Sequence, residues 1–309
     1  MKRKVIKQGN GTLTITLPKG WTDKVGLTGD SEVDVEASGR GLVVKTAGTK
    51  SYKSIDIELE SNNQRYIEQI LNNLYLSGYD EAHISLFNPA CLVNISRTIE
   101  NLMGYQIIEQ SDKNCLIKNL SPVAEEEFDS LLRRIFLLLK SMFSFLLDDL
   151  SKNTVDNLES VKATSKNITK FAYYCRRIII KKPLFNDYES TRIYILITRL
   201  NTCSHSIIYL YDNLVKENRL NIDRETLEFS RKTSDYFLLF YELYYSRKLK
   251  DLPKISTLHD EMINEMMPSL LRKNKNPIII HYMAQIVRDI ARNGGILFTL
   301  KEEKGADKG

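Results

Sequence analysis

The 309-residue sequence has few of the residues that form catalytic and metal sites. Its four cysteines, Cys91, Cys115, Cys175 and Cys203, are far apart and form no CxxC pair. This spacing favours reduced, mostly buried thiols in a cytoplasmic protein. The four histidines form no HExxH motif, and no GxSxG nucleophile elbow is present. The sequence therefore argues against an enzyme.

A long apolar run is also missing. The most hydrophobic stretch, residues 135–147, is too short to cross a bilayer and contains Lys140, so we expect a core helix there. The basic residues 2–4 run directly into a strand-like segment, which argues against a signal peptide. We therefore expect a cytoplasmic protein without a membrane span.

The net charge of +5 is mild, but it is unevenly distributed. Residues 1–50 contain nine basic and five acidic residues, whereas the rest of the chain contains 35 basic and 34 acidic residues. An excess confined to the start of the chain is typical of a nucleic-acid-binding module. An excess of this size also fits an ordinary solvated surface.

The first 48 residues predict a small β-rich module. Alternating apolar and polar residues indicate strands, and Pro18 suits the first turn of a short helix that Gly26 ends. The expected strands are 3–7, 12–17, 33–36 and 42–45, in the order β-β-α-β-β. So small a unit buries little apolar surface, and we expect it to complete its core by pairing with a second copy.

The segment KQGNGT, residues 7–12, raises the question of a phosphate-binding loop. In nucleotide loops the glycines follow a strand and lead into a helix. Here Gly9 and Gly11 lead into another strand, and no GKS or GKT follows. We therefore predict a turn in which the glycines supply positive φ, with Lys7 beside it.

The remainder predicts a small α/β segment at 49–120, a helical part at 121–303 and a tail at 304–309. In the α/β segment we expect strands at 55–59, 83–86, 105–110 and 115–120, with helices at 64–77 and 89–103. The helical part opens with Ser121 as N-cap and Pro122 in the first turn. Its six expected helices cover 122–151, 155–181, 188–217, 223–249, 256–273 and 277–303.

Two resemblances follow from these segments. Residues 3–46 combine a glycine turn before a β-branched strand, an LPK step into a helix, VGL-x-x-GD and two closing strands. This combination resembles the AbrB/SpoVT family, which implies swapped-hairpin dimers that bind DNA. The long helical part resembles PhoU-like domains, which implies two three-helix bundles. LNNLYLSGYDEAHISL, GYQIIEQSDKNCLIKNLS and EEEFDSLLRRIFLLLKSM are similar to an archaeal group of phosphate uptake regulators that joins both domains.

The resemblance to AbrB/SpoVT proteins implies a DNA-binding site in the first module. Its basic residues can contact phosphates, and its polar residues can add hydrogen bonds. The candidates are Arg3, Lys4, Lys7, Asn10, Thr12, Thr14, Lys19 and Lys24. The alternative is a module that only dimerises the chain.

PhoU-like domains imply metal clusters held by E/D-x-x-x-D motifs, whose carboxylates share one helix face. At the matching place on the third helix, Asn201 and His205 replace the two acids. The sixth helix offers Asp289 with Asn293. Asn and neutral His lack the negative charge that attracts such cations, so the sequence predicts no cofactor, although the resemblance would imply a metal cluster.

The sequence as a whole predicts a multi-domain, mainly α protein. We expect an N-terminal swapped-hairpin β module, a small α/β segment and then a PhoU-like six-helix part. The predicted function is a dimeric, double-stranded-DNA-binding transcription regulator in phosphate uptake or phosphate-responsive regulation. The alternative is a non-DNA-binding dimeric adaptor that docks on a phosphate-transporter or signalling partner through its helices.

Overall fold

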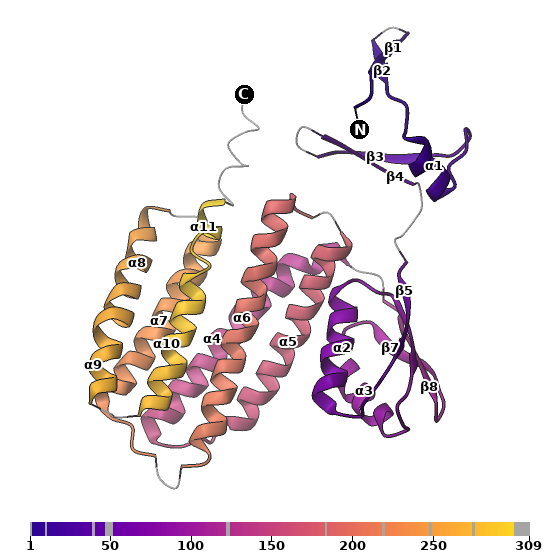
Figure 1. Ribbon diagram of the computed structural model, residues 1–309. Helices are drawn as coiled ribbons and strands as arrows, with labels where there is room; N and C mark the ends of the chain where they lie inside the picture. Colours follow the sequence, from indigo (N-terminus) through magenta and orange to yellow (C-terminus); the bar gives the residue numbers. More distant parts are fainter. Residues whose placement is uncertain are drawn as a thin grey trace. The chain divides into compact units, whose positions relative to one another are not determined.

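The computed structural model describes residues 2–9, 11–38, 41–46, 52–121, 124–182, 184–217, 220–246, 249–273 and 276–299 (Figure 1). The chain divides into two compact units, Met1–Tyr52 and Lys53–Gly309. The described part is mainly helical and carries a few small sheets, as the sequence predicts for a mainly α protein. No described helix is both long enough and apolar enough to span a membrane.

The first unit has the predicted β-β-α-β-β order. Strand β1 (Ile6–Gln8) pairs antiparallel with β2 (Thr12–Thr14), and β3 (Val33–Ser38) pairs antiparallel with β4 (Gly41–Thr46). Helix α1 (Lys19–Val25) lies between the two pairs in sequence. It ends as expected at Gly26, whose φ of 69° is left-handed. The first two strands are shorter than predicted, because their ladder stops at the Ile6–Thr14 pair.

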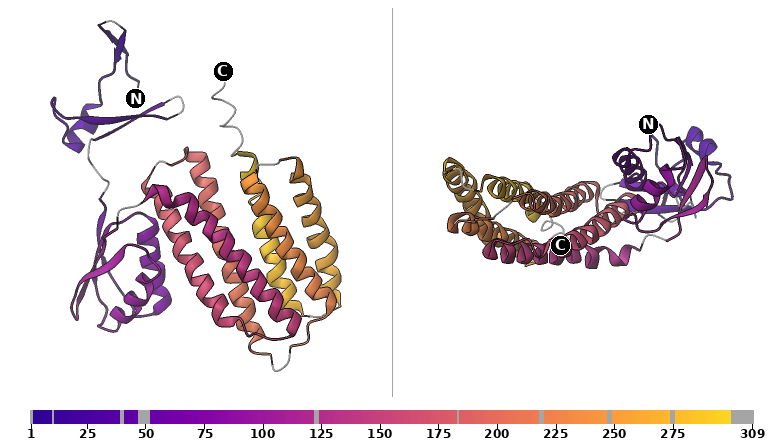
Figure 2. Two further views of the ribbon diagram at one scale, coloured as in Figure 1. Left: turned by 180° about the vertical axis from the view of Figure 1, so that it is seen from behind. Right: turned by 90° about the horizontal axis from the view of Figure 1, so that it is seen from below.

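The second unit begins with a four-stranded sheet in the order β5-β6-β8-β7. Two helices cover one face of this sheet, and alternate strand residues such as Ala82 and Ile84 are buried beneath them (Figure 2). Strands β5 and β6 are parallel, and β8 pairs antiparallel with both β6 and β7. The elements are β5 (Ser54–Glu58), α2 (Gln64–Leu76), β6 (Glu81–Ser85), α3 (Cys91–Ile99), β7 (Tyr105–Gln110) and β8 (Asn114–Asn119).

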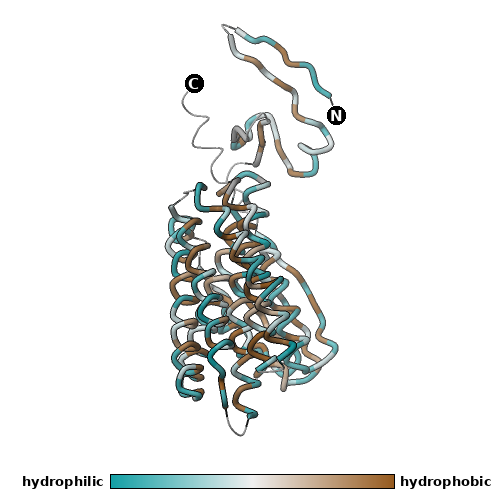
Figure 3. The backbone as a smooth tube through the Cα atoms, turned by 90° about the vertical axis from the view of Figure 1, so that its left-hand side faces the viewer, coloured by the Kyte–Doolittle hydropathy of each residue, from teal (hydrophilic) through white to brown (hydrophobic). Residues whose placement is uncertain are grey.

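Long helices form the rest of this unit. Helix α4 packs against α5, α6 and α7, while α10 packs against α6 and α7 (Figures 1 and 2). Apolar and polar residues alternate around each helix, as expected for helices that bury one face (Figure 3). The helices are α4 (Phe128–Lys152), α5 (Leu158–Lys181), α6 (Asp187–Leu214), α7 (Arg224–Ser246), α8 (Leu252–Asp260), α9 (Met267–Arg272), α10 (Pro277–Ala291) and α11 (Ile296–Thr299).

The buried side chains agree with two sequence predictions. Four of the six aromatic residues between 234 and 246 are buried in the core, where Phe237 and Phe240 stack near Phe136 at ring-centroid distances of 6.1 and 6.3 Å. All four cysteines are free and buried. Burial raises the pKa of the Cys115 thiol to about 11 and that of Cys175 to about 12.

The predicted start of the first long helix is wrong. A short 3₁₀ turn, η1 (Glu125–Glu127), precedes α4, and Pro122 lies outside the described residues. Two hydrogen bonds, one local and one tertiary, are made by the chain just before η1. The Asn119 side chain donates to the Ser121 carbonyl at 2.8 Å, and the Ala124 amide donates to the Tyr174 hydroxyl at 3.1 Å.

The last two predicted helices are interrupted. The fifth runs from α8 through a π-helical stretch, η3 (Glu261–Met266), into α9. Pro268 lacks the amide that an α-helix needs here, and a π stretch accommodates the loss. The sixth ends at Ala291, where Gly294 and Gly295 favour a turn before α11. Its predicted end beyond residue 299 lies outside the described residues.

Candidate functional site

The β1–β2 hairpin contains the glycine turn that the sequence singles out. Lys7 pairs with Leu13, and Gln8 pairs with Thr12. The φ angles of Gly9 and Gly11 are +63° and +96°, which confirms that these glycines supply left-handed backbone. A strand follows the turn, so the arrangement lacks the helix N-terminus on which a nucleotide loop depends.

The polar DNA-binding candidates of the hairpin differ in their hydrogen bonds within the protein. The Thr14 hydroxyl donates to the Ile6 carbonyl at 3.1 Å and lies 3.3 Å from Gln8 Oε1. Thr14 therefore stabilises the hairpin itself, although its oxygen can still accept a hydrogen bond. Thr12 is exposed near the turn, and Asn10 lies outside the described residues.

The basic candidates are all exposed. Arg3 and Lys4 precede β1, Lys7 lies in β1, and Lys19 and Lys24 lie at the two ends of α1. Within the described part of the chain, none of these five side chains makes an ion pair or a hydrogen bond. Their charges are therefore open to solvent, and to an anionic partner that reaches this surface.

The same unit exposes many apolar side chains. Leu13 and Leu42 are 66% and 65% exposed, and Val5, Ile6 and Val35 are each more than half exposed. No described residue of this unit before Tyr52 is buried. A module of this size without a core depends on further apolar contacts for its stability.

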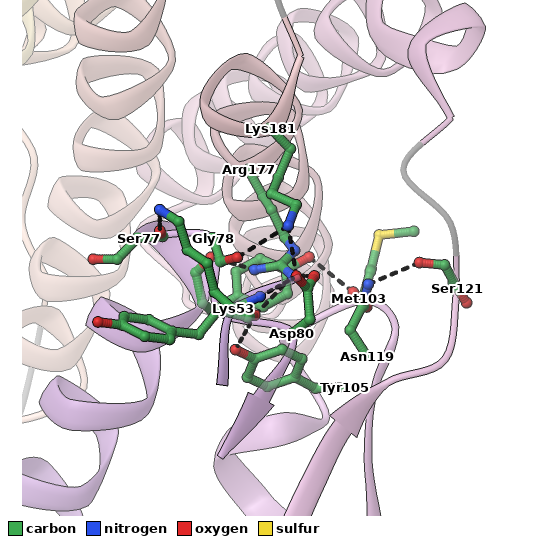
Figure 4. Close-up of polar contacts among 12 residues, drawn as sticks. Lys53, Ser77, Gly78, Asp80, Met103, Tyr105, Asn119, Ser121, Arg177 and Lys181 are labelled. Atoms are coloured by element: carbon green, nitrogen blue, oxygen red, sulfur yellow. Dashed lines mark hydrogen bonds and ion pairs between the residues drawn. The ribbon is translucent and has the colours of Figure 1, made fainter. Parts of the chain in front are cut away.

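The second unit contains a buried ionic cluster, which we call the junction, between the α/β segment and α5 (Figure 4). Arg177 of α5 is fully buried, and it donates to the carbonyls of Tyr75 and Tyr79 at 2.6 and 2.8 Å. Its Nη2 also lies 2.9 Å from Oδ1 of Asp80, between α2 and β6. Lys181 Nζ contacts the other carboxylate oxygen at 2.6 Å. Both oxygens of Asp80 are thus paired.

Aromatic rings enclose this guanidinium. It lies 4.7 Å from the ring centre of Tyr75 and 5.4 Å from that of Tyr105, within the range of cation–π attraction. The two rings meet edge to face at 4.9 Å. Burial raises the pKa of Tyr105 to about 12, so its hydroxyl stays neutral and donates to the Tyr79 carbonyl at 2.7 Å. Within the described residues, only Nε of Arg177 lacks a hydrogen-bond partner among the polar atoms of its side chain, and the contacts of the other two nitrogens hold the sheet segment on α5.

The residues at the places where PhoU-like domains imply metal motifs form hydrogen bonds between helices. On α6, Asn201 accepts from the Thr169 hydroxyl at 3.0 Å, and His205 Nε2 lies 3.1 Å from the same hydroxyl. Burial and the charge of Arg176 lower the pKa of His205, so its ring favours the neutral form. In the described residues, no three His, Cys, Asp or Glu side chains gather as a metal site.

Asp289 and Asn293, the residues at the second of these places, also form polar contacts within the protein. Asp289 forms an ion pair with Arg292 at 3.2 Å, and its carbonyl accepts from the Asn293 side chain at 3.1 Å. Asn293 in turn accepts from Arg199 of α6 at 3.1 Å. The last of these contacts links the turn after α10 with α6.

Sequence reasoning missed the junction. Asp80 and Arg177 are 97 residues apart, and in the sequence each looks like an ordinary charged surface residue. A turn at Ser77–Gly78 and an arginine on a largely apolar stretch of α5 are its only local signals.

Comparison with family models, with curated proteins and with solved structures finds no match to this chain. The resemblances drawn from the sequence motifs therefore remain predictions.

Proposed function

We propose that the chain is a homodimeric DNA-binding regulator. Its N-terminal AbrB/SpoVT-like module, residues 1–48, pairs with a second copy and contacts the DNA backbone. The observation that carries the proposal is the combination in this module of unpaired, exposed basic side chains with exposed apolar ones. The basic groups suit phosphates, and the apolar groups suit a second copy.

The remaining parts of the proposal rest on resemblance. Residues 49–120 form an α/β segment, and residues 121–303 form a PhoU-like domain of two three-helix bundles. By the same resemblance, the protein acts in the cytoplasm on phosphate uptake or phosphate-responsive transcription. Its helical domain changes the geometry of the paired hairpins when its own state changes.

A salt titration tests DNA binding. The intact protein is mixed with a fluorescently labelled duplex of arbitrary sequence, and anisotropy gives the affinity at several salt concentrations. Each phosphate that the protein neutralises contributes about 0.9 to the slope of log affinity against log salt. If both copies contribute, Lys7→Ala is expected to reduce the slope by up to about 2, and Lys4→Ala to act in the same direction.

A charge-matched control distinguishes site contacts from general electrostatics. Lys140 is exposed on α4 in the second unit, and Lys140→Ala removes the same charge without touching the module. It should leave the slope unchanged. Trp21 is the only tryptophan of the chain and lies on α1, so its emission gives a second reading of contact with DNA.

The alternative function gives the opposite result. An adaptor that uses the module only to dimerise would not bind the duplex even at low salt, and this outcome would reject DNA binding. Dimerisation is tested separately by sedimentation. Leu13→Asp or Leu42→Asp places a charge among the exposed apolar groups and is expected to yield monomers. A monomeric parent protein would remove the dimer from the proposal.

A further inference from the structure

The second unit has an open cleft of about 650 Å³ among α7, α8 and the end of α10, whose neighbouring positions Figure 1 shows. This volume lies in the range of small-molecule sites. Its lining residues are mostly apolar with a few polar groups: Tyr236, Leu252, Pro253, Ile255, Ser256, His259, Asp260, Ala291 and Gly294. Such a mixture is typical of sites that bind an apolar body and orient it by one polar end.

Tyr236 supplies an unsatisfied polar group. Its side chain is fully buried, and its hydroxyl has no hydrogen-bond partner among the described residues. Buried hydroxyls are almost always paired, so an unpaired one beside a cleft indicates a missing partner. Burial and the nearby charge of Asp260 raise the pKa of Tyr236, which keeps the phenol neutral.

The charge of the cleft selects the kind of partner. Asp260 contributes a carboxylate that is 68% exposed, with His259 Nδ1 at 3.1 Å and the Asn264 side-chain amide at 3.4 Å from its Oδ1. Among the described residues that line the cleft, none is a lysine or arginine. The polar end therefore presents oxygen acceptors and a negative charge, which disfavours anions and favours groups with N–H donors.

The local backbone is irregular at this place. The π-helical stretch η3 starts at Glu261, directly after Asp260. Stretches of this kind occur often at functional sites, and Pro268 also gives this one a structural cause. The helix thus changes from α-helical to π-helical directly after Asp260, the charged residue of the cleft.

We propose that this cleft binds a small organic amine, with its apolar body against Ile255 and Pro253 and its ammonium group between Tyr236 and Asp260. The ammonium would donate to the Asp260 carboxylate, and to the Tyr236 hydroxyl once a side-chain movement uncovers this buried oxygen. This site is separate from the DNA-binding module and does not depend on the proposed function.

Three probes with one ring system test the charge preference. Tryptamine carries a cation, indole-3-ethanol is neutral, and indole-3-propionate carries an anion. Binding to the full chain is followed through the δ1-methyl NMR signal of Ile255, assigned by Ile255→Val. Tryptamine is expected to shift this signal at millimolar concentration or below, and to bind about tenfold more tightly than the anion.

Variants locate the contact. Asp260→Asn should weaken tryptamine binding by up to about fivefold, because the carboxylate is mostly exposed, and should abolish the preference over the anion. Asp148→Asn is the matched control, because Asp148 is an exposed carboxylate on α4 that pairs with Lys152. Asp148→Asn should change neither the affinity for tryptamine nor the preference for tryptamine over the anion.

Tyr236→Phe gives an independent readout. Removing an unpaired hydroxyl should leave the melting temperature of the free protein unchanged or higher, while it weakens tryptamine binding. A lower melting temperature would mean that the hydroxyl is already satisfied. Absence of any Ile255 shift at about 10 mM of every probe, or equal affinity for cation and anion, would overturn the proposal.

Discussion

Replacing Asp80 by alanine would remove the only carboxylate that the structure pairs with Arg177 among the described residues. The guanidinium is fully buried, and Asp80 itself is 8% exposed. Loss of one partner from a buried ion pair costs about 3–5 kcal/mol, because the remaining charge is left uncompensated. Two backbone carbonyls and two tyrosine rings would still contact Arg177. We therefore expect the lower end, about 3 kcal/mol of unfolding free energy.

Urea unfolding followed by far-ultraviolet circular dichroism measures this loss, since most of the described helix belongs to the second unit. The matched control is Lys166→Ala. Lys166 of α5 pairs at 2.8 Å with Glu100, which directly follows α3, so this pair also joins the α/β segment to α5. Both side chains are at least half exposed. Solvent screens such pairs, and the control should shift the urea midpoint far less.

A double-variant cycle completes the test. Arg177→Met removes the charge that Asp80→Ala leaves unpaired, so the double variant should cost less than the sum of the single ones. Two results would refute the reasoning. One is a loss below about 1 kcal/mol for Asp80→Ala, and the other is strict additivity in the cycle.

Other predictions concern single buried groups. Burial lowers the pKa of His205, so the unfolded chain binds its proton more readily. The unfolding free energy should fall as pH decreases below about 6.5, and less so in His205→Gln, measured as melting temperature against pH. Asp149 is buried and accepts from the Tyr211 hydroxyl at 2.6 Å. In urea titrations Asp149→Ala should lose about 3 kcal/mol, more than Tyr211→Phe, since several donors lose their acceptor. Burial keeps the Cys115 and Cys175 thiols protonated, so Ellman's reagent should react with them at about pH 8 only after denaturation.

Much of the secondary structure could be predicted, because periodicity is a local property. The strand at Tyr105–Gln110 is predicted with its observed bounds, and the helix at Gln64–Leu76 is predicted to within one residue at its end. Helix starts and interruptions are harder to predict. The delayed start of α4 depends on a hydrogen bond from Ala124 to Tyr174, which is 50 residues away, and no local propensity encodes such an interaction.

Of the candidate site, the sequence correctly predicts the left-handed glycines and the order of the small elements. The role of Thr14 toward DNA stays a prediction, and its hydroxyl also donates within the hairpin, which the sequence does not predict. The cleft beside Tyr236 is not foreseen. It arises where α7, α8 and the end of α10 pack together, and the unpaired hydroxyl can be recognised only once the surrounding atoms are placed.

The junction also has a consequence for synthesis on the ribosome. Asp80 is made 97 residues before Arg177, so the sheet segment emerges long before its buried cation exists. Until α5 follows, the carboxylate and the carbonyls of Tyr75 and Tyr79 lack the cation that pairs with them. The nascent sheet segment therefore cannot reach its final packing until Arg177 has been synthesised and forms its hydrogen bonds. A ribosome stalled before residue 177 would carry a sheet segment that is open to proteases and chaperones.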